Sequence, residues 1–300
     1  MQRLDPSERA WDLAPALKDS SVQTLRRDSS SANMLTRFIE ANRRLCRRLT
    51  PTHVHEANVF GVYRKLGQIL LSHPRVSNVV DCGAGAQWWF PSYYKRWYAI
   101  KLIGLDIDRR EMESNADLDE RIECDVSLDI PLPPDSIDLC MASSGLEHFA
   151  DNEAFLRNAY RILRPGGFLL AQFPGRYAPF AIVNRLLPAG IKRRFLAASM
   201  GEDAELLGYV AHYDRTDYAS FAKMASDVGY KVTYHSPGYY SSTYAEFFFP
   251  FWLLSYLYDC LRFAIGMRSL ASYNLFLLQK PDQSSSEPLA LYAWPTETNE

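Results

Sequence analysis

Hydrophobic and polar positions alternate along the chain in a pattern that predicts an α/β fold. Short apolar runs typical of buried strands lie at 79–82, 103–106, 136–142 and 168–173. Segments with helical spacing separate these runs. Such alternation indicates a parallel sheet with helices on both faces. A later helix is predicted over 217–228, ended by Gly229, and two further strands over 230–235 and 273–279.

The segment 31–74 is predicted to hold two helices ahead of the first strand. Apolar residues recur in the first helix at three- and four-residue spacing: Leu35, Phe38, Ile39, Leu45, Cys46 and Leu49. The opposite face carries five arginines: Arg37, Arg43, Arg44, Arg47 and Arg48. The second helix should run from about Asn58 to Ser72 and stop before Pro74.

These patterns suggest one large domain with appendages. We expect a disordered lead over 1–30 and a disordered tail over 282–300, both polar. The main domain should cover 75–281. Two stretches interrupt its strand–helix alternation, at about 174–215 and 241–271, and are predicted to be insertions.

Composition limits the function classes. The 300 residues include 47% hydrophobic ones, enough for a sizeable core, and carry a net charge of −2. This balance gives no general attraction to nucleic acid, so no nucleic-acid partner is expected. The five cysteines form no CxxC pair and the N-terminus is too polar for a secretory signal, which favours a cytoplasmic location. No metal site is predicted, because His53, His55, His73 and His235 lack ligand spacing with cysteines or carboxylates.

The segment Val79–Gly85 predicts a nucleoside site. It reads as a buried strand followed by a glycine turn, and Gly83 and Gly85 allow the backbone to turn sharply and approach a ligand. Asp106 ends the next strand, at about the spacing of a ribose-binding acid. A dinucleotide site needs a small residue where this chain has Trp88, so the loop fits a mononucleoside better.

Further motifs follow in order. They are a short strand Arg121–Asp125, the turn Pro131–Pro133, the strand Ser136–Ala142, the segment Leu146–Phe149, and the segment Arg161–Leu169. With the glycine loop, this succession resembles the class I S-adenosylmethionine-dependent methyltransferases, in the subgroup acting mostly on small molecules. The resemblance is close over 75–175 and loose to 281. It implies a Rossmann-like, mostly parallel seven-stranded sheet of order 3-2-1-4-5-7-6, with an antiparallel last strand.

The resemblance implies S-adenosyl-L-methionine as cofactor and a set of contacts to it. The loop from Asp81 to Gly85 should meet the methionine half, Asp106 the ribose, Asp125 or Val126 the adenine, and the residues after the fourth strand the sulfonium. The predicted cofactor-binding residues are Asp81, Gly83, Ala84, Gly85, Asp106, Ile107, Asp125, Val126 and Ser143. Two alternatives stay open. Asp108 competes for the ribose role, and Asp81 can instead orient the loop backbone.

Methyl transfer is an in-line displacement, so positioning of the reactants supplies most of the catalysis. A base helps only where the acceptor loses a proton. His148 is one candidate base, because an imidazole accepts a proton near neutral pH; a capping or packing role is the alternative. His212 and Tyr213 fall where the family often places acceptor-side residues.

The expected function is methyl transfer to a small-molecule or lipid- or glycan-linked acceptor, with oxygen favoured as the target atom. No Asn/Asp-Pro-Pro-Tyr/Phe motif is present, which disfavours methylation of DNA bases. One rival is a non-catalytic relative that binds the nucleoside or a partner. The other is a nicotinamide oxidoreductase, against which Trp88 argues.

The segment Phe247–Ile265 is unusually aromatic and apolar. It approaches the length of a membrane span, but Pro250 interrupts it and Asp259 and Arg262 are costly within a bilayer. Three interpretations are open: a core helix, a dimer surface, or shallow contact with a membrane interface. The third would place the protein at the inner face of a membrane, with the arginines of 37–48 attracted to anionic lipid.

Overall fold

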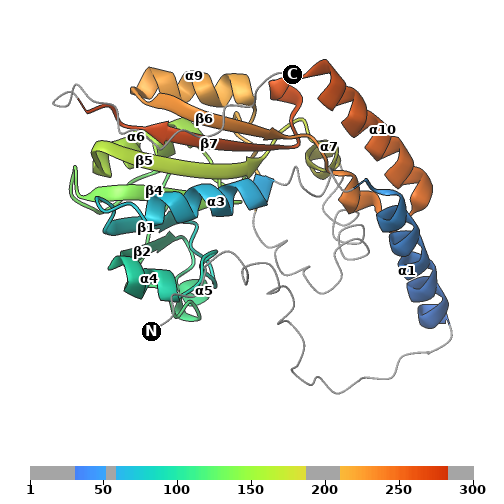
Figure 1. The fold of residues 1–300 in the computed structure, drawn as a ribbon, viewed down its shortest axis with the longest axis horizontal. Helices are drawn as coiled ribbons and strands as arrows, with labels where there is room; N and C mark the ends of the chain where they lie inside the picture. The colour runs from blue at the N-terminus through green and yellow to red at the C-terminus, as the bar shows by residue number, and fades with distance from the viewer. Residues whose placement is uncertain (1–30, 52–58, 187–209, 283–300) are drawn as a thin grey trace, which may run out of the picture.

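The computed structural model describes residues 31–51, 59–186 and 210–282. Its centre is a seven-stranded sheet of order β3-β2-β1-β4-β5-β7-β6 (Figure 1). The strands are β1 (Asn78–Cys82), β2 (Lys101–Asp106), β3 (Glu120–Glu123), β4 (Ile137–Ser143), β5 (Leu163–Pro174), β6 (Lys231–Gly238) and β7 (Tyr273–Gln279). Neighbouring strands pair in parallel except for β7, which is antiparallel to both β5 and β6. The predicted topology is confirmed.

Helices cover both faces of this sheet. The helices are α1 (Ser31–Leu49), α3 (Val59–Leu71), α4 (Tyr93–Tyr98), α5 (Arg109–Glu113), α6 (Asn152–Ile162), α7 (Pro179–Leu186), α9 (Tyr218–Val228) and α10 (Phe249–Ile265), with the 3₁₀ turns η2 (Ser242–Ala245) and η3 (Arg268–Leu270). Alternate residues of β1 point to opposite faces. Val79 joins a core with α3, α4 and α5, whereas Val80 and Cys82 join a core with α6 and α9.

Several predicted element ends move by a few residues. Strand β3 stops at Glu123, so Asp125 lies in the following turn rather than at the end of a strand. Pro250 was expected to interrupt its helix, and this is wrong: it lies in the first turn of α10, where a missing amide hydrogen leaves no intrahelical bond unmade. Gly229 ends α9 as expected, with φ of 111°.

Some predicted segments fall partly or wholly outside the described residues. These are the lead 1–30, the tail beyond 282, and 187–209 within the first predicted insertion. The described part of that insertion contains α7, and the predicted insertion at 241–271 contains η2, α10 and η3. Among the described helices, none has the length and apolar content needed to cross a membrane.

Candidate active site

The loop after β1 owes its shape to two glycines. Gly83 has φ of 75° and Gly85 has φ of 47°, in the left-handed region that a Cβ disfavours. The amides of Gly83 and Ala84 both donate to the carbonyl oxygen of Leu105, at 2.8 and 3.1 Å. The loop is therefore folded back onto the end of β2, which brings its amides beside Asp106.

Asp106 holds this loop in place. Its Oδ2 accepts from the amide of Gly85 at 3.0 Å, and its Oδ1 accepts from the amide of Asp108 at 3.0 Å. Each carboxylate oxygen has a second lone pair to offer a ribose hydroxyl. Asp108 instead caps α5, accepting from the amide of Arg110 at 2.8 Å. This arrangement favours Asp106 over Asp108 for the ribose, with Ile107 exposed between them.

Asp81 lies in β1 beneath the glycine loop and is buried. Burial, together with the negative charge of Asp106, raises the pKa of Asp81 to about 7. A positively charged group beside a buried carboxyl favours the ionised form of that carboxyl. This corner of the site therefore suits a cationic ligand group, whichever of the two predicted roles Asp81 has.

The turn that follows β3 is joined to the end of β2. The amide of Cys124 donates to the carbonyl oxygen of Asp106 at 2.9 Å. Asp125 then closes the turn, accepting from the amide of Ser127 at 2.8 Å, and Val126 is buried. The structure thus brings Asp125 and Val126 to the same sheet edge as Asp106, as the predicted adenine contact requires.

The end of β4 carries a polar cluster that includes a residue the sequence analysis missed. The hydroxyls of Ser143 and Ser144 donate to Oε1 of Gln172, at 3.1 and 3.3 Å. Gln172 is fully buried in β5, and its Nε2 has no hydrogen-bond partner among the described residues. A buried donor without a partner is costly, so this amide is suited to a bound ligand. The sequence did contain a signal for this residue, because Gln172 is a single glutamine within an otherwise apolar predicted strand.

Glu147, which the sequence analysis also did not select, lies in the turn between β4 and α6. It is 7% exposed, and its Oε2 has no partner among the described residues. Burial raises the pKa of Glu147 to about 8. Gly145, two residues before Glu147, lies close to the glycine loop: a Cβ added to Gly83 would be 3.8 Å from the Cα of Gly145. Glu147 is therefore a buried, titratable group next to the predicted cofactor site.

Three tyrosines lie close to Glu147. The hydroxyls of Tyr244 and Tyr273 are 2.6 Å apart. Burial raises the pKa of all three phenols, and the charge of Glu147 raises it further, with that of Tyr213 reaching about 12. The ring of Phe180 packs on Tyr244 and Tyr273, with centroids 4.7 and 5.6 Å away. We call Glu147, Tyr213, Tyr244 and Tyr273 the acceptor cluster.

The two candidate histidines differ in placement. Nδ1 of His148 is 3.2 Å from the carbonyl oxygen of Val210, and its Nε2 is 4.0 Å from Oε1 of Glu147. Burial lowers the pKa of His148, which favours the neutral form of the ring. His212 is exposed, and its backbone amide donates to the carbonyl oxygen of Glu147 at 2.8 Å. Both catalytic roles stay predictions.

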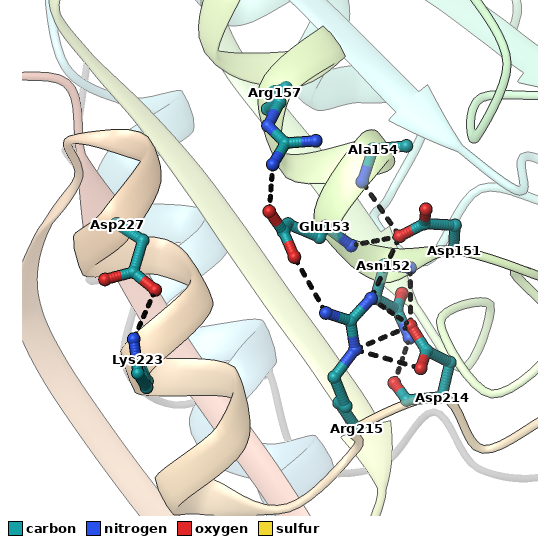
Figure 2. Close-up of polar contacts among 9 residues, drawn as sticks. All are labelled: Asp151, Asn152, Glu153, Ala154, Arg157, Asp214, Arg215, Lys223 and Asp227. Carbon is teal, nitrogen blue, oxygen red and sulfur yellow. Dashed lines mark hydrogen bonds and ion pairs between the residues drawn. The ribbon is translucent and has the colours of Figure 1, made fainter.

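A network around Arg215 holds the loop that carries Tyr213 against α6 (Figure 2). Arg215 donates to Asp214, to Oδ1 of Asp151 at 3.0 Å and to Oε2 of Glu153 at 2.8 Å. Asp214 also accepts from the amide of Asn152 at 3.0 Å. These bonds fix the loop that carries Tyr213 to the start of α6. Across the described ranges, no group of three or more His, Cys, Asp or Glu residues is placed to hold a metal ion.

Residues 80–171 match a family model described as a methyltransferase domain. The ubiquinone/menaquinone biosynthesis C-methyltransferase UbiE of Neisseria meningitidis is 30% identical over 116 residues, which cover 36% of this chain and 45% of that protein. A "probable S-adenosylmethionine-dependent methyltransferase" of Mycolicibacterium smegmatis is 31% identical over 80 residues, covering 26% of this chain and 31% of that protein. The chain spans less than half the length of either relative.

Among solved structures, an S-adenosylmethionine-dependent methyltransferase from Mesorhizobium loti is similar, with a TM-score of 0.44 and 15% identity over 73% of this chain and 96% of that one. The residues matched by the family model run from β1 into β5. That half of the sheet carries the glycine loop and Asp106, and the whole sheet has the strand order that the motifs predicted. Residues 80–171 therefore contain a methyltransferase domain, and the motifs and strand order of the chain are those of a class I S-adenosylmethionine-dependent methyltransferase.

Proposed function

We propose that this chain transfers the methyl group of S-adenosylmethionine to a small-molecule or lipid- or glycan-linked acceptor, with oxygen as the target atom. The observation that carries the proposal is the acceptor cluster. It places among three tyrosines a buried carboxyl, one of whose oxygens has no partner in the described part of the chain, in the turn that contacts the glycine loop. A hydroxyl acceptor loses its proton when it is methylated, and Glu147 is suited to take that proton.

The residues present fit S-adenosylmethionine. The cofactor carries a cationic ammonium group, which suits the carboxyls of Asp81 and Asp106. Its ribose hydroxyls suit the free lone pairs of Asp106, and the loop glycines leave room for close backbone approach. When bound, the cofactor supplies an activated methyl group on sulfur.

The chain's own residues then have separable tasks. The polar end of β4 and the Arg215 network hold the acceptor side rigid, so that the acceptor oxygen can lie in line with the methyl group. Tyr244 and Tyr273 offer hydroxyls to orient the acceptor. Glu147 in its ionised form takes the acceptor proton. A general base is most effective when its pKa lies near the operating pH, and the pKa of Glu147 is about 8.

Carbon is a second candidate for the target atom. It is favoured by the similarity to UbiE of Neisseria meningitidis, whose name describes a C-methyltransferase. A carbon acceptor must also lose a proton after methylation, so the same base would serve. Product analysis separates the two outcomes.

Calorimetry tests the cofactor first. We expect S-adenosylmethionine and S-adenosylhomocysteine to bind and NAD not to bind comparably. A mass-shift screen with methyl-labelled cofactor, over aqueous and organic extracts, then identifies the acceptor. Glu147→Gln should abolish most product formation, while Glu113→Gln, an exposed glutamate of α5, serves as the control. Tight binding of NAD with no response to either sulfur nucleoside would overturn the proposal.

A further inference from the structure

Helix α10 has its charged residues inside and its apolar residues outside. Asp259 and Arg262 are 0% and 1% exposed. Eight large apolar side chains of the same helix are between 38% and 66% exposed: Phe251, Leu253, Leu254, Leu257, Tyr258, Leu261, Phe263 and Ile265. A surface helix of a globular protein normally shows the reverse arrangement. Helix α10 is therefore not a core helix, which removes one of the three interpretations of this segment.

The orientation of α10 is fixed by the buried pair. Asp259 forms an ion pair with Arg262 and accepts from the amides of Ser241 and Ser242, at 2.7 and 2.8 Å. Arg262 donates to the carbonyl oxygens of Tyr239 and Leu270, at 2.8 and 2.7 Å. The two charged side chains thus bind α10 to the segment that precedes it in the sequence and to the segment that follows it. Because they face the protein, they do not oppose contact between the outer face and lipid.

Helix α1 extends the same apolar surface. The start of α10 meets α1 (Figure 1), and the ring of Phe38 is 6.4 Å from that of Phe248, which is 5.1 Å from that of Phe251. Oδ1 of Asn42 accepts from the amide of Phe249 at 2.9 Å, which fixes the helices together. Four large apolar residues of α1 are between 43% and 74% exposed: Met34, Phe38, Leu45 and Leu49. Together with the eight residues of α10 they form what we call the α1–α10 face.

A row of positive charge borders this face. At 3.6 residues per turn, Arg37, Arg44 and Arg48 fall in one row of α1, next to the row of exposed apolar residues. All three arginines are exposed, and Glu40 is the exposed acidic residue on the same helix. Arg47, another arginine of the predicted basic face, is instead held by Glu246 at 3.0 Å. The border therefore has an excess of positive charge.

We propose that the α1–α10 face docks on an anionic lipid membrane. Two features bind amphipathic helices to such surfaces. Apolar side chains enter the membrane interface, and neighbouring arginines contact the anionic headgroups. A second copy of the chain would cover the apolar residues too. However, it would bring another row of arginines to the rim, whereas anionic headgroups neutralise the row. The charge favours the membrane as the occupant.

Docking would place the acceptor cluster at the membrane. Tyr244 lies in η2, immediately before α10, and Tyr273 opens β7, a few residues after it. Their hydroxyls meet at 2.6 Å, so α10 is inserted between two residues of the cluster. This consequence, which rests on the proposed function, points to a lipid-linked acceptor. Membrane docking itself does not depend on it.

Vesicle co-sedimentation of the full chain tests the docking, without cofactor or acceptor. We expect binding to vesicles containing phosphatidylglycerol, little binding to pure phosphatidylcholine, and weakening with added salt. Arg37, Arg44 and Arg48 changed together to Gln should reduce binding on the order of a hundredfold, because each arginine near an anionic surface contributes about fivefold. The control changes three exposed arginines elsewhere, Arg64, Arg75 and Arg96, to Gln.

The apolar half has its own variants. Changing Leu254, Leu257 and Leu261 to Ser should remove vesicle binding while circular dichroism and the melting temperature stay unchanged, because these side chains face outward. Leu128→Ser, at another exposed leucine, is the control. The proposal would be overturned if the wild-type protein did not co-sediment with anionic vesicles at low salt. A dimer, seen by light scattering, that the three serines convert to monomers would also overturn it. Cofactor binding, measured separately, reports on the proposed function alone.

Discussion

Replacing Glu147 with Gln gives a prediction about stability that can be worked from the structure. Burial raises the pKa of Glu147 from its ordinary value of 4.5 to about 8, so the folded state holds this proton more tightly than the unfolded state. The stabilisation is fully present below pH 4.5 and is lost as the pH rises through about 8. At about 1.4 kcal/mol per pH unit, the loss approaches roughly 5 kcal/mol.

A glutamine has nearly the same shape and never ionises, so Glu147→Gln should escape this loss. At pH 9 the variant should melt on the order of 10 °C above the wild type, since about 1 kcal/mol corresponds to a few degrees in a chain of this size. Near pH 5 the two should melt alike. Asp81, with a pKa of about 7, is still present in both proteins, so the variant keeps a shallower decline.

The same variant tests the catalytic role. Losing a general base costs about a hundredfold to ten-thousandfold in turnover, whereas binding of S-adenosylhomocysteine should be preserved. Differential scanning calorimetry between pH 5 and pH 9 gives the stability, and product formation from labelled cofactor gives turnover, with Glu113→Gln as control. Melting curves that decline in parallel with the wild type would refute the burial argument. Wild-type turnover in the variant would refute the role as base.

Three further outcomes follow from the same contacts. Asp106→Asn should weaken cofactor binding by calorimetry at least about tenfold, since charged hydrogen bonds are worth roughly 1.5–3 kcal/mol; Asp108→Asn should not, and the opposite order would exchange their roles. Arg215→Met should lower turnover because the loop before α9 loses its attachment, whereas Lys223→Met, which breaks only an exposed pair (Figure 2), should not; equal effects would contradict this. Asp259→Asn should cost about 3–5 kcal/mol in urea unfolding, because it leaves a buried cation unpaired, and an unchanged midpoint would contradict it.

The sheet and the loops at its carboxyl edge could be predicted because their signals are local. Each strand is a short apolar run, and a turn between them is marked by Gly83 and Gly85, whose φ values need glycine. Asp106 ends a strand in the sequence and in the structure. Parallel strands bring such ends to one edge, so short-range patterns are sufficient to place these residues together.

The acceptor cluster could not be predicted in the same way, because its members meet only through long-range packing. Glu147 and Tyr244 are separated by α6, β5, α7, α9 and β6 in the chain. Their proximity depends on how β7 enters the sheet and on how the loop around Tyr213 folds back. His148 was a candidate base from the sequence because the ordinary pKa of an imidazole lies near neutral pH. The pKa of the adjacent Glu147 is raised only by its burial in the folded protein, which the sequence does not reveal.

The direction in which α10 faces was also beyond the sequence. Its apolar residues and its charged pair both have helical spacing, so either side could have faced the protein. The amides of Ser241 and Ser242 decide the matter by binding Asp259, and these lie in a segment whose path the sequence does not give. In the sequence, Asp259 and Arg262 argue against a full membrane span, whereas in the structure they are buried and leave the apolar residues of the helix facing outward.

A crystal structure with S-adenosylhomocysteine tests the account most directly. We predict ribose hydroxyls on Asp106, the adenine beside Val126, and the sulfur above the end of β4, facing the acceptor cluster. The amide of Gln172 should gain a partner, directly or through water. A ribose bound to Asp108, or a sulfur that faces away from Glu147, would contradict the account.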